Sequence, residues 1–316
     1  LSIEEPDYLR MFGRWVWDAW LIANALEKGT GHVSFWNDDT GFYHDVLELP
    51  DGTAHSLEVF SMQAIVPLFA GIAIPATAAD AVRTVRRMLS ELSSAYDHTD
   101  QDVRLELPGG DGTHHMYAVV DQDRLAAILA RVLDPEQLLA PNGIRSLSKY
   151  HCQYPYVYHV GNQDYAVSYA PAESRDRMFG GNSNWRGPVW MPMNFLFVQA
   201  LNSYGRFLGD TFTVPDPDDP ADSDGPAAQV SLGTVADRMA RRLTGLLVRD
   251  QSGRRAAFGD NEYFQNDPHW RDLVPFHEYF DGDNSRGLGA SHQTGWTATI
   301  ALLLQFRGKL HFDESV

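Results

Sequence analysis

Cysteine, lysine and long hydrophobic runs are all scarce in this chain. Cys152 is the only cysteine among 316 residues, which excludes an intrachain disulfide and favours a reducing compartment, so we expect a cytoplasmic location. Lysine occurs only at positions 28, 149 and 309 and the formal net charge is −17, so the clustered cations that nucleic acids require are missing. The apolar runs are short and interrupted by charge or glycine, and none predicts a membrane span.

Several chemical motifs are also missing. The sequence has no Gly-x-Ser-x-Gly elbow of a serine hydrolase, no glycine-rich phosphate loop and no His-Glu-x-x-His zinc motif. The acidic segment 281–292 begins like a calcium-binding loop, but Arg286 stands where that loop needs glycine and His292 where it needs glutamate. We therefore expect neither a cofactor nor a metal.

Helical periodicity dominates what is present, and a hydrophobic fraction of 44% is ample for a sizeable core. The spacing of apolar residues predicts helices over 7–28, 57–73, 77–92, 121–133, 191–207, 229–248 and 291–306. Residues 150–169 are rich in tyrosine and valine and are predicted to be extended, whereas 97–118 are predicted to form a loop or small hairpin. We expect an all-α fold of toroid type, incomplete, with short β hairpins in its loops. It forms a single domain over residues 1–316, with a solvated acidic loop at 210–228.

One aromatic-rich turn, residues 182–190, suggests a sugar site. It places Trp185, Arg186 and Trp190 just before the helix predicted at 191–207. A sugar packs its C–H face on an aromatic ring and needs fixed hydrogen-bond partners for its hydroxyls, which a guanidinium supplies. The alternative is structural: both indoles anchor the helix in a core and Arg186 pairs with a buried acid.

A second informative stretch runs from Pro275 to Trp296. Glu278 lies between His277 and Tyr279, and the glycine-rich loop after it can fold back to bring Gln293 and Trp296 close to its carboxylate. A carboxylate beside an amide and an indole can hold a water and the hydroxyls of a sugar, as a general base in glycoside cleavage must. Alternatively, Glu278 caps or pairs locally. Glu173 is a weaker rival for the base, because no amide or aromatic partner follows it at short range.

A third stretch, residues 36–45, sets Asp38, Asp39 and Asp45 among aromatic residues. The turn at Asp39-Thr40-Gly41 accounts for Asp39 structurally. Asp45 has two open interpretations, since it could hydrogen-bond a sugar hydroxyl or close the hairpin.

Taken together, these three stretches resemble the C-terminal half of glycoside hydrolase family 63, which includes mannosylglycerate hydrolase and processing α-glucosidase I. The motifs are Trp36-Asn-Asp-Asp-Thr-Gly-Phe-Tyr-His-Asp45, Gly180-Gly-Asn-Ser-Asn-Trp-Arg-Gly-Pro-Val-Trp190, and His277-Glu-Tyr-Phe through Gln293-Thr-Gly-Trp296. They span nearly the whole chain. The resemblance implies an (α/α)6 toroid and anomer-inverting hydrolysis of an α-linked glucoside or mannoside.

The resemblance also implies roles for single residues. Glu278 matches the general base that activates water, and Gln293 matches a substrate-binding glutamine. Trp185, Arg186 and Trp190 match the segment that lines the site of the cleaved sugar. Trp36, Tyr43 and Asp45 match a motif near the same pocket.

One departure from the family pattern concerns the second carboxylate. The family's general acid is an aspartate in a Gly-x-x-Asp-Asn-type motif, and this sequence contains no copy of it. Three explanations are open: the chain is the C-terminal piece of a longer enzyme, a local residue such as Asp39 or Asp45 is the acid, or activity is lost. We favour the first. The expected partners are an oligosaccharide or small glycoside and an N-terminal half of the same enzyme. The alternative function is a non-catalytic carbohydrate-binding or toroid-completing fragment.

Overall fold

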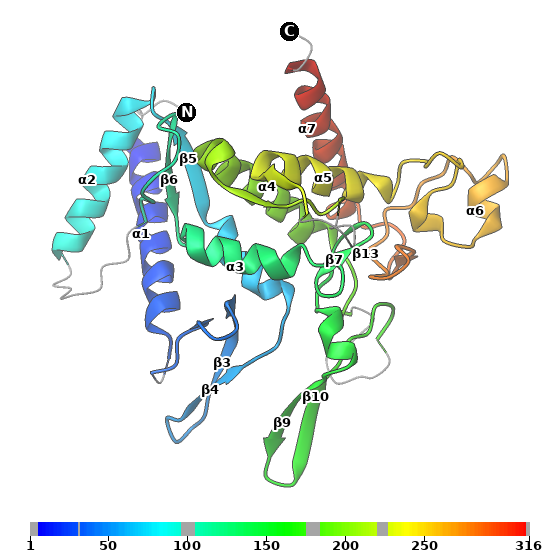
Figure 1. Cartoon of the computed structure of the whole chain (residues 1–316), viewed down its shortest axis with the longest axis horizontal. Coiled ribbons are helices and arrows are strands. Elements are labelled where there is room, and N and C mark those ends of the chain that lie inside the picture. The colour runs from blue at the N-terminus through cyan, green and yellow to red at the C-terminus, as the bar shows by residue number, and fades with distance from the viewer. Residues whose placement is uncertain (1–5, 31, 96–104, 175–183, 220–226, 314–316) are drawn as a thin grey trace.

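The computed structural model describes residues 6–30, 32–95, 105–174, 184–219 and 227–313 (Figure 1). Its α-helices are α1 Pro6–Lys28, α2 Ala79–Ala95, α3 Gln122–Val132, α4 Met191–Leu208, α5 Leu232–Gly245, α6 Glu262–Asn266 and α7 Ile300–Asp313. Short 3-10 turns are η1 Met62–Phe69, η2 Lys149–Cys152, η3 Gly209–Thr211, η4 Ala256–Phe258 and η5 Thr297–Thr299. No helix in these ranges is both long enough and apolar enough to cross a bilayer.

The strands form small antiparallel pairs and no larger sheet within the described residues. The pairs are β1 Trp36–Asn37 with β2 Phe42–Tyr43, β3 Asp45–Glu48 with β4 Ala54–Leu57, β5 Gly71–Pro75 with β6 His114–Ala118, β7 Leu139–Ala140 with β8 Gly143–Ile144, β9 Tyr156–Val160 with β10 Gln163–Val167, β11 Thr213–Pro215 with β12 Gln229–Ser231, and β13 Tyr279–Phe280 with β14 Gly287–Leu288. The described part of the chain is therefore a mixture of helices and hairpins with no closed barrel, and the all-α prediction holds only in part.

Helix α4 is the centre of the core. It packs along α5 and also contacts η1, β5 and α7, while α1 and α2 stand together at the N-terminal side (Figure 1). The side of α4 that carries Phe197, Leu201 and Phe207 is fully buried. Burying large apolar side chains is the main favourable contribution to folding, so this helix fixes the position of the turn that precedes it.

Asn194 ties the start of α4 to the β7–β8 hairpin. Its Oδ1 accepts a hydrogen bond from the Ile144 amide at 2.6 Å, and its Nδ2 donates to the Ile144 carbonyl at 3.2 Å and to the Trp190 carbonyl at 2.9 Å. Gly143, with φ +132°, lies against the side-chain amide of Asn194. A Cβ at this position would be 2.9 Å from Asn194 Oδ1. The buried amide thus positions Trp190, the residue that caps α4.

Several predicted helices differ from the structure. The helix predicted over 57–73 is wrong: the segment holds the end of β4, the 3-10 turn η1 with Pro67 inside it, and the start of β5. The helices predicted to begin at 229 and 291 begin at 232 and 300, after β12 and η5 respectively. The segment 97–118 supplies β6, which pairs with β5.

The acidic loop predicted at 210–228 has anchored flanks. Asp216 is buried and its carboxylate lies 2.6 Å from Arg238 on α5, while Asp218 pairs with Arg242 at 2.8 Å. Residues 220–226, in the middle of that prediction, lie outside the described residues.

Candidate active site

Four aromatic side chains from distant parts of the sequence form one stack. Trp185 lies parallel to Trp190, with ring centroids 4.0 Å apart and an interplanar angle of 2°. Tyr279 stacks on Trp190 at 4.8 Å, and Trp296 meets Trp190 edge-on at 5.4 Å. Trp190 is completely buried, whereas Trp185 is 46% exposed and Trp296 38% exposed. The sequence predicted that the indoles of Trp185 and Trp190 would both face a sugar. Trp190 has no exposed surface and supports the stack from within, whereas Trp185 and Trp296 have exposed ring surface.

Backbone pairing builds this stack. The Val189 amide donates to the Phe280 carbonyl at 2.8 Å, and the Phe280 amide returns a bond to Val189 at 2.9 Å. This antiparallel bridge sets Trp190 beside Tyr279, since residues that flank such a bridge lie opposite one another. The Trp190 indole Nε1 donates to the Asn184 carbonyl at 3.0 Å, which satisfies the buried ring nitrogen.

The carboxylate of Glu278 is held at the open end of the β13–β14 hairpin. The backbone amide of Glu278 donates to the Ala290 carbonyl at 2.8 Å, and the Ala290 amide donates to the Glu278 carboxylate oxygen Oε2 at 3.1 Å. Gly289 has φ +68°, and a Cβ there would lie 2.7 Å from Oε2 and 2.6 Å from Cε1 of Tyr279. The half-buried carboxylate is therefore a neighbour of the aromatic stack, and only glycine fits between them.

The loop after Glu278 folds back onto the strand that carries it, as predicted, while the approach of the Gln293 side chain to the carboxylate stays a prediction. The Gln293 amide donates to the Phe276 carbonyl at 2.6 Å, and the Gln293 carbonyl accepts from the Thr297 amide at 3.0 Å. Thr297 donates its hydroxyl to the carbonyl of His277, the residue before the carboxylate. The short turn from Gln293 to Trp296 is thereby fixed beside the strand that carries Glu278.

Arg186 is buried and hydrogen-bonds to polar groups of nearby residues. Its amide donates to Oδ1 of Asn184 at 3.0 Å and its Nη2 to the Ser174 hydroxyl at 2.7 Å. The guanidinium also lines a pocket of about 340 Å³ next to Trp185. A volume of this size suits a small ligand. The pocket is lined by Val59, Ser61, Met62, Gln63, Ser146, Leu147, Val167, Ser174, Asn184, Trp185 and Arg186. Glu278 is not among these residues.

Trp36 and Tyr43 belong to a second cluster. Their rings meet edge-on at 4.9 Å across the β1–β2 hairpin, and Arg124 lies 5.0 Å over Trp36 and donates to the Tyr43 hydroxyl at 3.3 Å. Trp36 also donates from Nε1 to Asp38 at 2.7 Å. It lines a separate hollow of about 350 Å³, so the structure does not bring Trp36 and Trp185 into one pocket. Both hollows border the segment 56–63.

The carboxylates considered as acids lie near Trp36. Asp39 is exposed at the tip of the turn, where its amide donates a hydrogen bond to Asn37 Oδ1 at 2.9 Å. Asp45 begins β3 opposite Leu57. Partial burial of its carboxyl raises the pKa of Asp45, and the neighbouring His44 opposes that rise.

A second carboxylate, that of Glu173, lies close enough to Tyr279 of the stack to affect it electrostatically. Its Oε2 lies 3.8 Å from Nη2 of Arg286. Burial raises the pKa of Tyr279, and the negative charges of Glu173 and Glu278 add to that rise. Sequence reasoning missed the proximity of Glu173 to Tyr279 and the stacking of Tyr279 on Trp190, because these partners are far apart along the chain. The glycine-rich run 287–289 was a signal for the tight approach.

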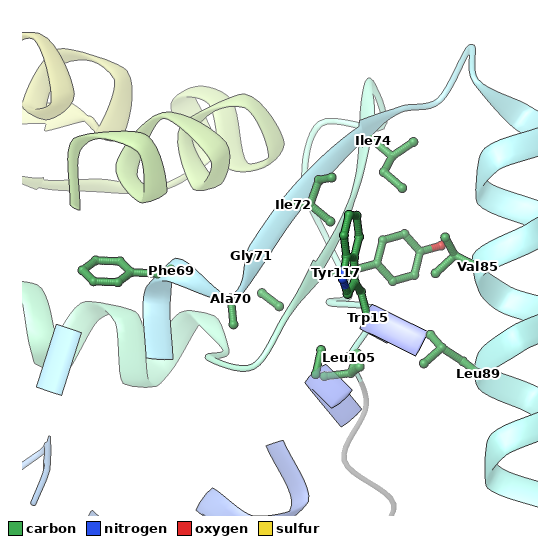
Figure 2. A pocket seen from close by; sticks show the side chains of 12 residues that line it. Trp15, Phe69, Ala70, Gly71, Ile72, Ile74, Val85, Leu89, Leu105 and Tyr117 are labelled. Carbon is green, nitrogen blue, oxygen red and sulfur yellow. The ribbon is translucent and has the colours of Figure 1, made fainter. Parts of the chain in front are cut away.

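The most apolar pocket lies elsewhere, between α1, α2 and the β5–β6 pair (Figure 2). Trp15, Ile72, Leu89 and Tyr117 line it, and the Tyr117 hydroxyl and the Trp15 indole nitrogen are the polar atoms drawn among these side chains. A sugar needs several convergent hydrogen-bond partners, so this pocket is a poorer candidate than the hollow beside Trp185.

Comparison with known proteins gives the family. The family model described as "Mannosylglycerate hydrolase MGH1-like glycoside hydrolase domain" matches residues 113–297, which include Glu278 and the whole aromatic stack. The chain is 38% identical over 271 residues to an uncharacterized protein of Saccharomyces cerevisiae, covering 85% of this chain and 24% of that protein. It is 24% identical over 185 residues to a probable mannosyl-oligosaccharide glucosidase of Schizosaccharomyces pombe, covering 58% and 16%. It is also 24% identical over 182 residues to the mannosyl-oligosaccharide glucosidase of S. cerevisiae, covering 57% and 15%.

The chain thus spans a quarter or less of the length of these relatives. The resemblance of its motifs to glycoside hydrolase family 63 is confirmed by the matched family and by the two glucosidases. This chain belongs to the mannosylglycerate hydrolase MGH1-like glycoside hydrolases.

Proposed function

We propose that this chain carries the water-activating half of an inverting α-glycosidase site, with Glu278 as the general base and an α-linked glucoside or mannoside as substrate. The observation that carries the proposal is the placement of the Glu278 carboxylate. One oxygen accepts from the Ala290 amide at 3.1 Å, and the group lies beside Tyr279 of the aromatic stack. A carboxylate oriented by a backbone amide is suited to act as a general base.

The proposed reaction is a single displacement. Glu278 takes a proton from water as the water oxygen attacks the anomeric carbon, and the bond to the leaving oxygen breaks on the opposite face of the ring. An acid donates a proton to the leaving oxygen, so the product sugar has the inverted anomeric configuration. The water must fit between base and sugar, which is why the two carboxyl groups of such enzymes stand roughly 6.5–9.5 Å apart.

The neighbouring residues are proposed to bind the sugar. Trp185 and Trp296 offer exposed ring surface to its C–H face, and Trp190 supports both rings from below. Arg186 and Gln293 supply hydrogen bonds to hydroxyls. A more distant part of the substrate is proposed to bind at the second hollow, which Trp36 lines. Tyr43 would support Trp36 from behind, and Asp45 follows at the start of β3.

The described helices are proposed to be part of an incomplete (α/α)6 toroid, with the rest and the general acid supplied by an N-terminal portion of the same enzyme. Asp45 is the local alternative for the acid, because a carboxyl whose pKa is raised holds its proton at higher pH. Asp39, fully exposed at its turn, has no such feature. A cytoplasmic location remains part of the proposal and rests on the single cysteine.

The test is the Glu278→Gln variant, assayed on α-linked glucosides and on mannosyl- and glucosylglycerate. It keeps the shape of the side chain and removes the base, so we expect a loss of about 10² to 10⁴ in kcat. Glu173→Gln is the matched control, since Glu173 also lies near Tyr279. Full activity of Glu278→Gln, or an equal loss in Glu173→Gln, would remove the assignment to Glu278.

The second candidate function is carbohydrate binding without cleavage. It is favoured by the exposed face of Trp185 beside a pocket that Glu278 does not line. Calorimetry with α-linked disaccharides separates the two functions: saturable binding without release of sugar supports the second, and turnover excludes it.

A further inference from the structure

Three guanidinium groups gather at a polar pocket that the proposed glycosidase site does not use. The pocket has a volume of about 490 Å³. It is lined by Asn142, Gly245, Asp250, Arg254, Arg255, Ala256, Gly259, Asp260, Gln265, Asn284 and Arg286. The arginines come from two places: the segment around η4, and the turn of the β13–β14 hairpin. Such a concentration of cations is unexpected on a chain with a net charge of −17.

The carboxylates near these arginines compensate them unevenly. Arg254 has a close partner in Glu262 at 3.0 Å. Arg286 reaches Glu173 only at 3.8 Å. Arg255 reaches Asp272 only at 4.0 Å, and that carboxylate already accepts a 3.0 Å hydrogen bond from another arginine, Arg249.

Among the residues that the structure describes, the two acidic ones that line the pocket, Asp250 and Asp260, form no ion pair with Arg255 or Arg286. The Asp250 carboxylate is occupied by its own turn, where Oδ1 accepts from the amides of Ser252 at 2.8 Å and Arg254 at 2.9 Å. The Ser252 hydroxyl, which donates to the same oxygen at 2.7 Å, lowers the pKa of Asp250 most, and the two amides add to that effect. Asp260 is exposed at the surface. Within the described part of the chain, the guanidinium groups of Arg255 and Arg286 therefore have only loose ion pairs, at 4.0 and 3.8 Å.

Arg255 is poorly compensated in charge: its Nη1 donates to the Leu247 carbonyl, but the carboxylate that pairs with it, Asp272, lies 4.0 Å away. The Arg255 side chain is only 16% exposed, and its Nε is buried without a hydrogen-bond partner among the described residues. Burial lowers the pKa of Arg255, and the positive charge of Arg249 adds to that effect. Desolvating a cation beside another cation is unfavourable unless an anion is bound nearby.

We propose that this pocket binds a small oxyanion, a phosphate or carboxylate group, between the guanidinium groups of Arg255 and Arg286. Arginine suits this ligand because its planar fork donates two parallel hydrogen bonds to an oxyanion. Asn284 lines the same pocket, where its Oδ1 accepts from the Arg286 amide at 3.0 Å, and its Nδ2 would donate to a remaining oxygen. The site is distinct from the hollow beside Trp185, with which it shares no lining residue.

Isothermal titration calorimetry of the 316-residue chain with inorganic phosphate, at constant ionic strength, tests this proposal. We expect saturable binding at one site per chain. Arg286→Gln should weaken that binding at least about tenfold, the effect of removing one charge-assisted hydrogen bond. Arg286 is chosen because its side chain is 47% exposed, so its replacement should leave the fold intact.

Arg241→Gln is the matched control, because this exposed arginine pairs with Asp237 on α5 outside the pocket. It should bind phosphate as the unchanged chain does. Glu278→Gln should also bind phosphate normally, so the outcome does not depend on the proposed catalytic role. Acetate in place of phosphate distinguishes a carboxylate ligand from a phosphate. Absence of saturable binding to both anions, or equal weakening in Arg286→Gln and Arg241→Gln, would overturn the proposal.

Discussion

The backbone amide of Ala290 donates a hydrogen bond to Oε2 of Glu278 at 3.1 Å, across a strand pair in which the Glu278 amide donates to the Ala290 carbonyl at 2.8 Å. A hydrogen bond from a rigid backbone group orients a carboxylate better than one from a mobile side chain. The proposed base therefore depends on the geometry of the chain around residue 289 as much as on its own identity.

Replacing Gly289 with alanine should displace the carboxylate. The added Cβ would lie 2.7 Å from Oε2, at a residue with φ +68°. We expect a destabilisation of about 1–2 kcal/mol from the left-handed backbone together with a loss of at least about tenfold in kcat from misplacement of the base.

Gly161→Ala separates these two effects. Gly161 has φ +59° with open space around it, so the substitution brings the backbone strain without the collision. Thermal unfolding should shift in both variants, whereas kcat should fall only in Gly289→Ala. Equal activity of the two variants would show that the Gly289 contact does not position the carboxylate.

The two stacked indoles should respond differently to truncation. Trp190 is completely buried, and Trp190→Ala should lower the free energy of unfolding by about 3–5 kcal/mol. Trp185 is 46% exposed, so Trp185→Ala should change stability far less but weaken sugar binding. Chemical denaturation and calorimetry with the substrate sugar measure the two effects. A larger loss of stability in Trp185→Ala would contradict the support role assigned to Trp190.

The stability of the fold should fall below neutral pH through His151. Its Nε2 accepts from the Phe60 amide at 2.9 Å while Nδ1 bonds the Tyr154 carbonyl at 2.9 Å, an arrangement that requires the neutral ring. Burial lowers the pKa of His151 from its ordinary value of 6.5. Because the unfolded chain binds the proton more readily, this contribution to stability is complete above pH 6.5 and is lost as pH falls toward the lower pKa of the folded state.

Urea unfolding at a series of pH values measures this loss. His151→Gln should flatten the decline in the free energy of unfolding between pH 7 and 5, a window set by the ordinary histidine pKa of about 6.5. His159→Gln is the control, since His159 is exposed on β9. An unchanged slope in His151→Gln would show that this histidine does not govern the acid sensitivity.

The sequence predicted those features that depend on local patterns. Helices α1, α3 and α4 have uninterrupted apolar spacing and lie close to their predicted bounds. The helix predicted over 57–73 failed because its apolar residues are divided between a 3-10 turn and a strand, and the strand's partner, β6, lies some forty residues away. The pairing has no local signal. The break has one in Pro67, which the apolar spacing outweighed in the prediction.

The same distinction applies to the candidate site. The approach of Trp296 to the strand of Glu278 could be predicted, since one glycine-rich loop joins them. The stacking of Tyr279 on Trp190 could not, because it depends on the bridge between Val189 and Phe280, ninety-one residues apart in the printed sequence. The separation of Trp36 from the hollow beside Trp185 likewise results from packing around segment 56–63.

The most direct test of Glu278 as the base is chemical rescue of Glu278→Ala by azide, with the product followed by proton NMR. Azide needs no base to attack, so it should restore cleavage of an α-linked glycoside and give the β-glycosyl azide, with inversion. An α-glycosyl azide, or Glu278→Ala that hydrolyses the substrate at the unchanged rate without azide, would contradict the account.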